Sequence, residues 1–528
     1  MKAAHLRSFG LIGALLAGCA SQPSLDDLEP MRAATEVHID PALAAGLEET
    51  PPEASPEGDS DLWQRLRAGF ALDLEVDNAR ITAQRNWYAR NQAYLDRVAT
   101  RAERYLHYMV EEAERREMPL ELVLLPIVES AFDPFAYSHA RASGPWQFIP
   151  GTGRMFGMNQ DFWHDGRRDI IASTEGALSY LQRLSDRFDG DWLLALASYN
   201  AGAGNVSRAI TRNQRAGRST DYWSLHLPRE TMAYVPKLIA LAQIVADPGA
   251  YDVALRPIAD EPYFSIVDTG GQIDMTQAAE LADISVEELY MLNPHINQWA
   301  TPPDGPHRLL VPVSKADSFA EKVAALPVSE RMAWEEYRIQ NGDSLIRIAN
   351  RFNTTPNVLR SVNRIRGNTI IAGNTLLIPR PREGAESYPL SADARLAARQ
   401  NRSVAGRQQV SHRVRPGDTF WDLGRTYGAS HREIAAWNNM APTDMLRVGQ
   451  ELVIWTQNQV PANAGVAGQP NMIRRVNYAV RRGDSLHRIA NRFNVSVNEI
   501  QRWNSIDPNR YLQPGQQLTL YVDIRDAN

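Results

Sequence analysis

The sequence is poor in cysteine: Cys19 is the only one in 528 residues. A single thiol excludes an internal disulfide, a CxxC redox pair and a thiolate metal cluster, so packing must hold the fold. HExxH and GxSxG motifs are also missing. The glycine-rich segment 151–157 fails to match the dinucleotide-binding fingerprint. We therefore predict neither a metal nor a cofactor.

Lysine is absent from Trp334 onward, where 26 arginines against 16 acidic residues give a net charge of +10, while the remainder carries −16. Clustered arginines would indicate nucleic acid, but these are scattered, so we predict a solvated surface and no nucleic-acid partner. Hydrophobic residues at 44% and charged residues at 22% exclude wholesale disorder and a polytopic membrane protein. At roughly 100 to 200 residues per domain, the length predicts at least three domains.

The first residues have the pattern of a secretory signal. Lys2 and Arg7 precede an apolar run from Phe9 to Leu16, which at about eight residues is too short to span a bilayer of roughly 30 Å. The four residues that follow this pattern, 16–19, read Leu-Ala-Gly-Cys and resemble the lipobox of bacterial lipoproteins.

That resemblance implies cleavage after residue 18 and lipid attachment to Cys19, which would become the mature amino terminus. Ala20 and Ser21 resemble outer-membrane sorting residues, so the expected location is the periplasmic face of the outer membrane. The alternative is an ordinary signal peptide that happens to contain a small apolar cysteine. Residues 19–60 lack an apolar period and contain several prolines and acids, which predicts a flexible tether.

Residues 61–250 are predicted to form a mostly α-helical globular domain. Apolar residues such as Tyr94, Val98, Tyr105 and Met109 recur at helical spacings, and strand-like alternation is missing. Residues 251–330 mix short strand-like runs with one helical stretch, 276–292.

The remainder contains a threefold repeat. Each copy has a short strand signal, a Gly-Asp-Ser/Thr triplet, an Asn 21 residues after the glycine, and a closing Gly before a second strand signal. The triplets begin at Gly342, Gly417 and Gly483, and the asparagines are Asn363, Asn438 and Asn504. The predicted unit is β-α-α-β.

The polar triplets can be explained by local structure. Glycine permits a turn out of the strand, and Asp, Ser or Thr can supply an N-cap oxygen to the following helix. Gly-Asp-Ser-Leu is also a nucleophile signature of an esterase family, which would make Ser344 or Ser485 catalytic. This alternative is weakened because the middle copy has Thr419 followed by Phe420, and because a nucleophile has no reason to recur periodically.

The repeats resemble LysM modules, which bind glycans containing N-acetylglucosamine. This resemblance implies a shallow sugar groove between the loop after the first strand and the loop before the last. The candidate glycan-loop residues are Asp343, Ser344, Asp418, Thr419, Asp484 and Ser485. A stretch from Phe264 to Pro312 resembles a degenerate fourth copy without the triplet. The expected ranges are 335–380, 411–455 and 476–522 for the modules, 381–410 and 456–474 for linkers, and 251–330 for the intermediate region.

Glu129 is the candidate acid of the helical domain. It ends an apolar run that begins at Leu122, so its carboxyl should be partly desolvated, which raises the pKa and keeps the proton available. An exposed or paired glutamate at a helix end is the alternative on context alone.

Five motifs in order around Glu129 resemble the soluble lytic transglycosylase domain, within a motif core of 115–240. They are Glu129-Ser130, Ser138, Gly144-Pro145-Trp146-Gln147, Tyr199-Asn200-Ala201-Gly202, and Glu230-Thr231 with Tyr234-Val235. Many members have Leu-Met where this chain has Pro145-Trp146, so the residue that lines the sugar subsite there stays open. Together with the repeats and the lipobox, the chain resembles membrane-bound lytic transglycosylases that carry LysM modules.

The resemblance implies a lysozyme-like catalytic domain that cleaves the bond from N-acetylmuramic acid to N-acetylglucosamine in peptidoglycan without water, leaving a 1,6-anhydro ring. Glu129 would act as acid and then as base, and Glu230 would support the site. The expected substrate-binding residues are Ser138, Trp146, Gln147, Tyr199, Asn200 and Tyr234.

Purely structural roles are the alternatives for these residues. Gln147 and Asn200 could satisfy loop backbone, Tyr199, Tyr234 and Trp146 could be core, and Glu230 a structural acceptor. Trp163 and Phe148 could be sugar-stacking surface or core. Asp133 could be a second carboxylate but more plausibly caps the following segment. A hydrolytic muramidase and a non-catalytic wall-binding scaffold are the alternative functions.

Overall fold

The structure is a computed structural model, and it describes residues 61–352, 354–456, 473–481, 484–486, 489–490, 497–504, 512–513 and 515–523. The expected signal peptide, the tether and Cys19 lie outside the described residues, as does most of the expected linker 456–474. Two compact units are separated between Trp455 and Thr456. Within the described part, no helix combines the length and the apolar character needed to cross a membrane.

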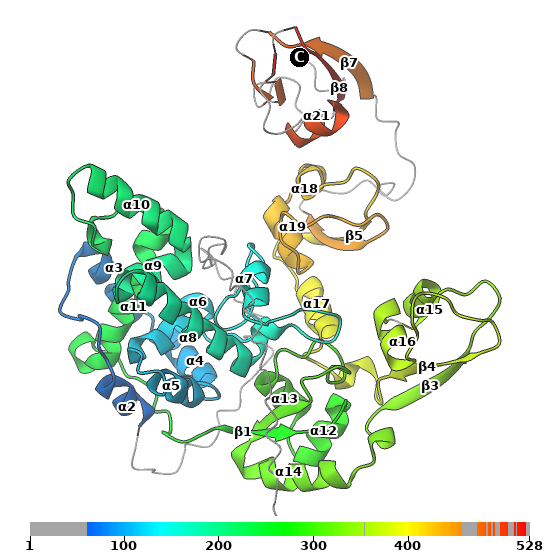
Figure 1. Ribbon diagram of the computed structural model, residues 1–528, viewed down its shortest axis with the longest axis horizontal. Coiled ribbons are helices and arrows are strands. Elements are labelled where there is room, and N and C mark those ends of the chain that lie inside the picture. The colour runs from blue at the N-terminus through cyan, green and yellow to red at the C-terminus, as the bar shows by residue number, and fades with distance from the viewer. Residues whose placement is uncertain are drawn as a thin grey trace, which may run out of the picture. The chain divides into compact units, whose positions relative to one another are not determined.

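The first part of the larger unit is a helical domain, as the spacing of its apolar residues predicts (Figure 1). Its core is built from buried aliphatic and aromatic side chains of nearly every helix. The α-helices are α2 (Leu62–Ala68), α3 (Ala79–Ala89), α4 (Gln92–Ala102), α5 (Leu106–Glu114), α6 (Leu125–Ser130), α7 (Pro150–Met155), α8 (Ile170–Arg187), α9 (Trp192–Ala201), α10 (Ala203–Arg215) and α11 (Arg229–Ala246). Short 3-10 turns cover Leu120–Leu124, Gly166–Arg168, Tyr222–Ser224 and Gly249–Tyr251.

Helix α6 is short because both of its ends are fixed locally. Pro126 lies in the first turn, where its missing N–H costs no hydrogen bond. At the other end, Ala131 and Phe132 adopt left-handed backbone with φ of 52° and 56°. Their N–H groups bond to the carbonyls of Ile127 and Pro126 at 3.2 and 3.1 Å, which closes the last turn. The chain thus turns sharply two residues after Glu129.

A β-α-α-β unit follows, with a further helix after it. Strand β1 (Phe264–Asp268) pairs antiparallel with β2 (Arg308–Pro312). Between the strands lie α12 (Met275–Ala282) and α13 (Val286–Leu292), and α14 (Val313–Ala325) follows. The helical stretch 276–292 is therefore two helices, because Asp283 adopts left-handed backbone with φ 53° and Ser285 caps the second helix.

The repeats have the predicted β-α-α-β order where the structure describes them. The first module contains β3 (Ala333–Arg338), α15 (Leu345–Arg351), α16 (Pro356–Val362) and β4 (Thr375–Arg380). The second contains β5 (Gln408–Arg413), α18 (Phe420–Tyr427), α19 (His431–Trp437) and β6 (Glu451–Thr456). In the smaller unit, β7 (Ile473–Ala479) pairs antiparallel with β8 (Gln517–Asp523), and α21 (Val497–Asn504) lies between them in sequence.

The repeated asparagine ties the second helix of each module to the last strand. The Nδ2 of Asn363 donates to the carbonyls of Leu359 and Leu377, and its Oδ1 accepts from the Leu377 N–H at 2.7 Å. Asn438 and Asn504 make the same three bonds in their modules. Asn293 does so between α13 and β2. The region from β1 to β2 therefore shares the construction of the repeats although it lacks their triplet.

The segment 381–410 differs from the expected linker. It contains α17 (Ala392–Asn401) and buries Tyr388 and Leu390 in the core formed by β1 to α14. The Tyr388 hydroxyl donates to Asp274 Oδ2 at 2.9 Å. Its composition, rich in Ala and polar residues, predicts a flexible linker. The side chains of Tyr388 and Leu390 and the Tyr388 hydroxyl are nevertheless enough to hold the segment against the neighbouring domain.

Candidate active site

Glu129 occupies the last turn of α6, and its side chain is fully buried. Its Oε1 accepts a hydrogen bond from the Tyr234 hydroxyl at 2.5 Å. Its Oε2 has no hydrogen-bond partner among the described residues. Burial raises the pKa of this carboxyl to about 8, against the opposing effect of the Tyr234 hydrogen bond. Burial therefore favours the protonated form of Glu129 at neutral pH.

Helix α11 brings two of the expected residues to this carboxyl. Tyr234 is 2% exposed, and burial raises its pKa well above its ordinary value, so it remains a hydrogen-bond donor to Glu129. Glu230 lies one turn earlier on the same helix, and its charge adds to the rise in the Glu129 pKa, whereas Lys237 opposes it. Glu230 therefore acts on the acid through charge.

Helix α9 supplies Tyr199 and Asn200, which are also buried. The Tyr199 hydroxyl donates to the Trp146 carbonyl at 2.9 Å, and the charge of Glu129 contributes to the raised pKa of Tyr199. The Oδ1 of Asn200 accepts from the Thr231 hydroxyl at 2.7 Å. The Nδ2 of Asn200 is buried and has no partner among the described residues. A donor left over in this way can bind a substrate oxygen, because a buried donor without a partner is costly.

The chain between α6 and α7 forms a loop, residues 131–149, that carries Ser138 and Gln147. The Ser138 hydroxyl oxygen accepts from the N–H groups of Ala140 and Ala142 at 3.2 and 3.0 Å. Gln147 adopts left-handed backbone with φ 52°, and its amide donates to the Gly144 carbonyl at 2.8 Å. Both expected ligands therefore help to shape the loop that presents them.

Gly144 and Ser130 fix the same loop against the helices. Gly144 has φ +83°, and a Cβ there would lie 2.2 Å from the Arg167 carbonyl oxygen, so no other residue fits. The Ser130 hydroxyl lies 3.0 Å from the carbonyl oxygens of both Pro126 and Pro145. The residue that follows Glu129 thereby holds the turn that leads to Gln147.

The aromatic residues considered for sugar stacking are in the core. Trp146 is fully buried, and its indole N–H donates to the Thr174 hydroxyl on α8 at 3.1 Å. Phe148 and Trp163 are 0% and 3% exposed. Trp146 contributes its backbone carbonyl to Tyr199, and its ring packs inside the helical domain, which favours the core alternative over sugar stacking for this residue.

Asp133 caps the loop instead of facing a substrate. Its Oδ1 accepts from the Phe135 N–H at 2.9 Å, and the side chain is buried. The motifs include Thr231 but did not indicate its role as the hydrogen-bond donor to Asn200. Motif reasoning missed Phe135, because nothing in the local sequence marks it.

The triplets shape the loop after the first strand of each module. Asp343 Oδ2 accepts from the Tyr337 hydroxyl and the Gln340 N–H, both at 2.8 Å. Ser344 and Thr419 cap α15 and α18, as the N-cap interpretation predicts. Asp418 and Asp484 repeat the bonds of Asp343 with equivalent partners.

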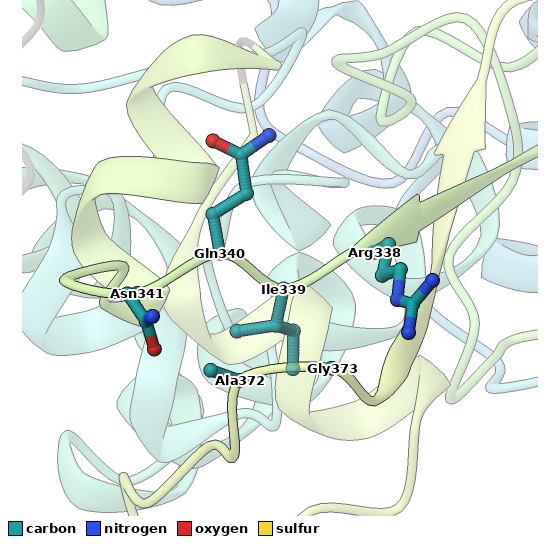
Figure 2. A pocket seen from close by; sticks show the side chains of 6 residues that line it. All are labelled: Arg338, Ile339, Gln340, Asn341, Ala372 and Gly373. Carbon is teal, nitrogen blue, oxygen red and sulfur yellow. The ribbon is translucent and has the colours of Figure 1, made fainter.

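The first module has an open pocket of about 470 Å³ between its two loops. It is lined by Arg338, Ile339, Gln340, Asn341, Ala372 and Gly373 (Figure 2). The two loops are joined by a bond from the Gly373 N–H to the Ile339 carbonyl at 2.8 Å. The pocket lies where the family resemblance implies a sugar groove. Its lining consists of the last residue of β3 and loop residues beside the triplet, and the candidate residues Asp343 and Ser344 are not part of it.

Comparisons with known proteins agree with this geometry. Family models match the transglycosylase SLT domain at residues 108–222, the LysM-like domain of lytic transglycosylase MltD at 263–328, and the LysM domain at 337–379, 412–455 and 478–520. The chain is 36% identical over 467 residues to membrane-bound lytic murein transglycosylase D of Escherichia coli (strain K12), covering 88% of this chain and 86% of that protein. The same protein from a second Escherichia coli strain gives the same values.

Among solved structures, the inactive mutant of lytic transglycosylase Slt from Pseudomonas aeruginosa matches 29% of this chain and 26% of that one, with 24% identity and a TM-score of 0.21. Because the sequence relationship to the Escherichia coli enzyme extends over most of both chains, this chain belongs to the family of membrane-bound lytic murein transglycosylase D, and it is a lytic transglycosylase.

Proposed function

We propose that this enzyme cleaves the β-1,4 bond from N-acetylmuramic acid to N-acetylglucosamine in peptidoglycan without water, with Glu129 as its single acid and base. The observation that carries the proposal is the Glu129 carboxyl itself. It is buried, it bonds to Tyr234 through one oxygen, and its pKa is raised to about 8. A carboxyl in this state can donate a proton at neutral pH, which is what a glycosidic leaving group needs.

The proposed reaction returns Glu129 to its starting state. Glu129 gives its proton to the glycosidic oxygen as the bond from C1 to that oxygen breaks. The resulting carboxylate then takes the proton of the C6 hydroxyl as that oxygen bonds to C1 and closes the 1,6-anhydro ring. The Tyr234 hydroxyl stabilises the carboxylate between these two steps, because a hydrogen bond to the charged form favours it.

The surroundings of Glu129 favour this route over hydrolysis. Hydrolytic glycosidases normally need a second carboxylate as nucleophile or water activator. Asp133, the nearest candidate in sequence, is engaged with the Phe135 N–H. Glu230 sits on the helix that carries Tyr234 and already influences Glu129 by charge. Asp133 is therefore assigned to capping the loop and Glu230 to an electrostatic effect on Glu129, which leaves Glu129 as the single acid and base of the proposed reaction.

Substrate contacts are assigned to the residues gathered around this carboxyl. The free Nδ2 of Asn200 would donate to a sugar oxygen, and Ser138 and Gln147 would bind the saccharide from the loop 131–149. Tyr199 would hold that loop by its bond to the Trp146 carbonyl. Glu230 would keep the Glu129 proton in place.

The LysM modules are proposed to hold the glycan, and Cys19 to anchor the enzyme by lipid at the periplasmic face of the outer membrane. The pocket of the first module supports the first assignment, since several weak sites on one polymer raise the local substrate concentration. The lipobox resemblance and the membrane-bound relative support the second.

The product of the reaction tests the mechanism. Purified sacculi digested with the full-length protein should yield sugar ends that are lighter by one water than reducing ends, as measured by mass spectrometry. Glu129→Gln should abolish release. Glu121→Gln is the matched control, because Glu121 is an equally buried glutamate of the same domain that bonds to the Ala71 and Leu72 N–H groups. Reducing ends would establish a muramidase, and release by Glu129→Gln would remove Glu129 from the reaction.

A further inference from the structure

The loop 131–149 reaches out of the helical domain and inserts one side chain into the neighbouring domain. Phe135 is 5% exposed and belongs to the core that β1, α12, α13, β2 and α14 enclose. The members of this core include Ile273, Met275, Tyr290 and Phe319. Among its described members, Phe135 alone comes from the helical domain, and it stands three residues before Ser138.

Two arginines cover the Phe135 ring from different elements. The Arg395 guanidinium on α17 lies 4.4 Å from the ring centroid, and that of Arg168 lies at 5.9 Å. Both side chains also bond to the Asn297 side-chain oxygen, Arg395 at 3.4 Å. Cation–π contacts are strongest where they are desolvated. The docked segment 381–401 therefore completes the pocket that receives Phe135.

A chain of hydrogen bonds through Asp165 and Arg167 also connects the neighbouring domain to the loop. The Asp165 N–H donates to the His295 carbonyl, which follows α13, at 2.8 Å. The Asp165 carboxylate accepts from Arg167 at 2.7 and 2.9 Å. Arg167 in turn donates to the carbonyls of Arg141 and Phe148, at 3.0 Å for Phe148. The neighbouring domain thus contacts the loop directly through Phe135 and indirectly through Arg167.

Ion pairs and hydrogen bonds connect the helical domain to the LysM-like domain, residues 263–328. Arg308 on β2 contacts both carboxylate oxygens of Asp169 at 2.9 Å, and Asp169 caps α8. Arg104, in the turn between α4 and α5, pairs with Glu288 on α13 at 2.8 Å. The Tyr105 hydroxyl donates to the Met291 carbonyl at 2.6 Å. Largely buried ion pairs and hydrogen bonds of this kind constrain relative orientation.

From these contacts we infer that Phe135 is a positioning residue for the transglycosylase reaction, and that the LysM-like domain serves catalysis by holding the loop that presents Ser138 and Gln147. The inference rests on the proposed function. Its physical reason is the backbone of the loop, in which four non-glycine residues adopt left-handed conformation: Ala131, Phe132, Arg141 and Gln147. Non-glycine residues in this region cost free energy and persist only when the surroundings fix them.

Phe135→Leu in the full-length protein tests the inference. The variant shortens the side chain in the receiving core and removes the ring beneath Arg395. Because displacement of positioning groups by about 1 Å can cost up to about 100-fold in rate, we expect kcat/KM on a soluble peptidoglycan fragment to fall roughly tenfold, mainly through KM. The alkaline limb of the pH profile should stay in place, because Glu129 and Tyr234 lie on helices outside the loop.

Phe319→Leu is the matched control. It makes the same chemical change at a fully buried position of the same core, on α14 and away from the loop. It should lower the melting temperature as much as Phe135→Leu and leave KM within about twofold. Arg395→Gln provides a second variant that leaves the core intact and should raise KM by a smaller factor.

Unchanged kinetics in Phe135→Leu and Arg395→Gln would overturn the inference, as would equal losses in Phe319→Leu. If Phe135→Leu does not fold, the KM of Arg395→Gln decides alone. Failure of the proposed function has a separate signature, because Glu129→Gln would then retain activity whatever the loop variants do.

Discussion

Replacing Glu129 by glutamine should make the protein more stable near neutral pH. The folded state keeps this carboxyl protonated up to about pH 8, because burial raises its pKa to about 8 from an ordinary value of 4.5. The unfolded chain releases the proton at the lower pH. Between these two values the folded state binds more protons, so the free energy of unfolding falls as the pH rises.

The magnitude follows from the two pKa values. At about pH 7 the unfolded state is favoured by roughly 3 kcal/mol through ionisation of Glu129, and at about pH 4 by almost nothing. Glutamine has no such ionisation, and its side-chain oxygen can still accept the Tyr234 hydrogen bond. Glu129→Gln should therefore unfold with a free energy about 2 to 3 kcal/mol higher near pH 7, with the difference vanishing near pH 4.

Urea unfolding followed by far-ultraviolet circular dichroism at several pH values would measure this difference, since the helical domain dominates that signal. Glu175→Gln is the control, because Glu175 is an exposed glutamate on α8 of the same domain. It should show no pH-dependent gain. A Glu129→Gln variant whose stability parallels that of the parent at every pH would refute the argument that desolvation holds the proton on Glu129.

Three further outcomes follow from other contacts. Tyr234→Phe removes the donor to Glu129, so kcat should fall about 10- to 100-fold and the alkaline limb should move to higher pH, measured by a pH–rate profile. Burial lowers the pKa of His295 to about 4, so below about pH 6.5 the unfolded chain binds a proton that the folded state does not, and the folded state loses stability. In urea unfolding, the parent should therefore lose about 2 kcal/mol relative to His295→Asn between pH 7 and pH 5. Asn438→Ala leaves three backbone groups of the second module unpaired at a cost of about 2 to 4 kcal/mol, which should weaken retention on insoluble sacculi without changing kcat on a soluble fragment.

The sequence could predict the elements whose determinants are local. The triplets predicted helix caps, which the structure has at Ser344 and Thr419, and the fixed spacings of the repeat predicted a β-α-α-β unit, because both depend on residues close along the chain. The bonds of Asn363 to the last strand were not predicted from its spacing. The apolar run before Glu129 predicted a buried acid for the same reason.

Features that depend on distant partners could not be predicted. Phe135 reads as an ordinary apolar loop residue, and only the fold brings it into a core built from residues after 260. Trp146 was expected to face sugar because it lies in a site motif, yet its indole bonds to Thr174, 28 residues away. The segment 381–410 was expected to be a linker because its composition is too polar to form a core of its own. Composition cannot show that Tyr388 and Leu390 pack into the core of a neighbouring domain.

The burial of Glu129 gives a physical reason for the contact between the helical domain and the LysM-like domain. Keeping Glu129 protonated requires desolvation, and desolvation destabilises the folded state near neutral pH by several kcal/mol. The loop beside it adds several residues in left-handed backbone. A helical domain that carries both costs must gain stability elsewhere. Phe135 adds packing at the loop, and the pair of Arg308 with Asp169 adds buried hydrogen bonds at the start of α8. Functional strain and interdomain packing are thus placed on the same segment of chain, where one offsets the other.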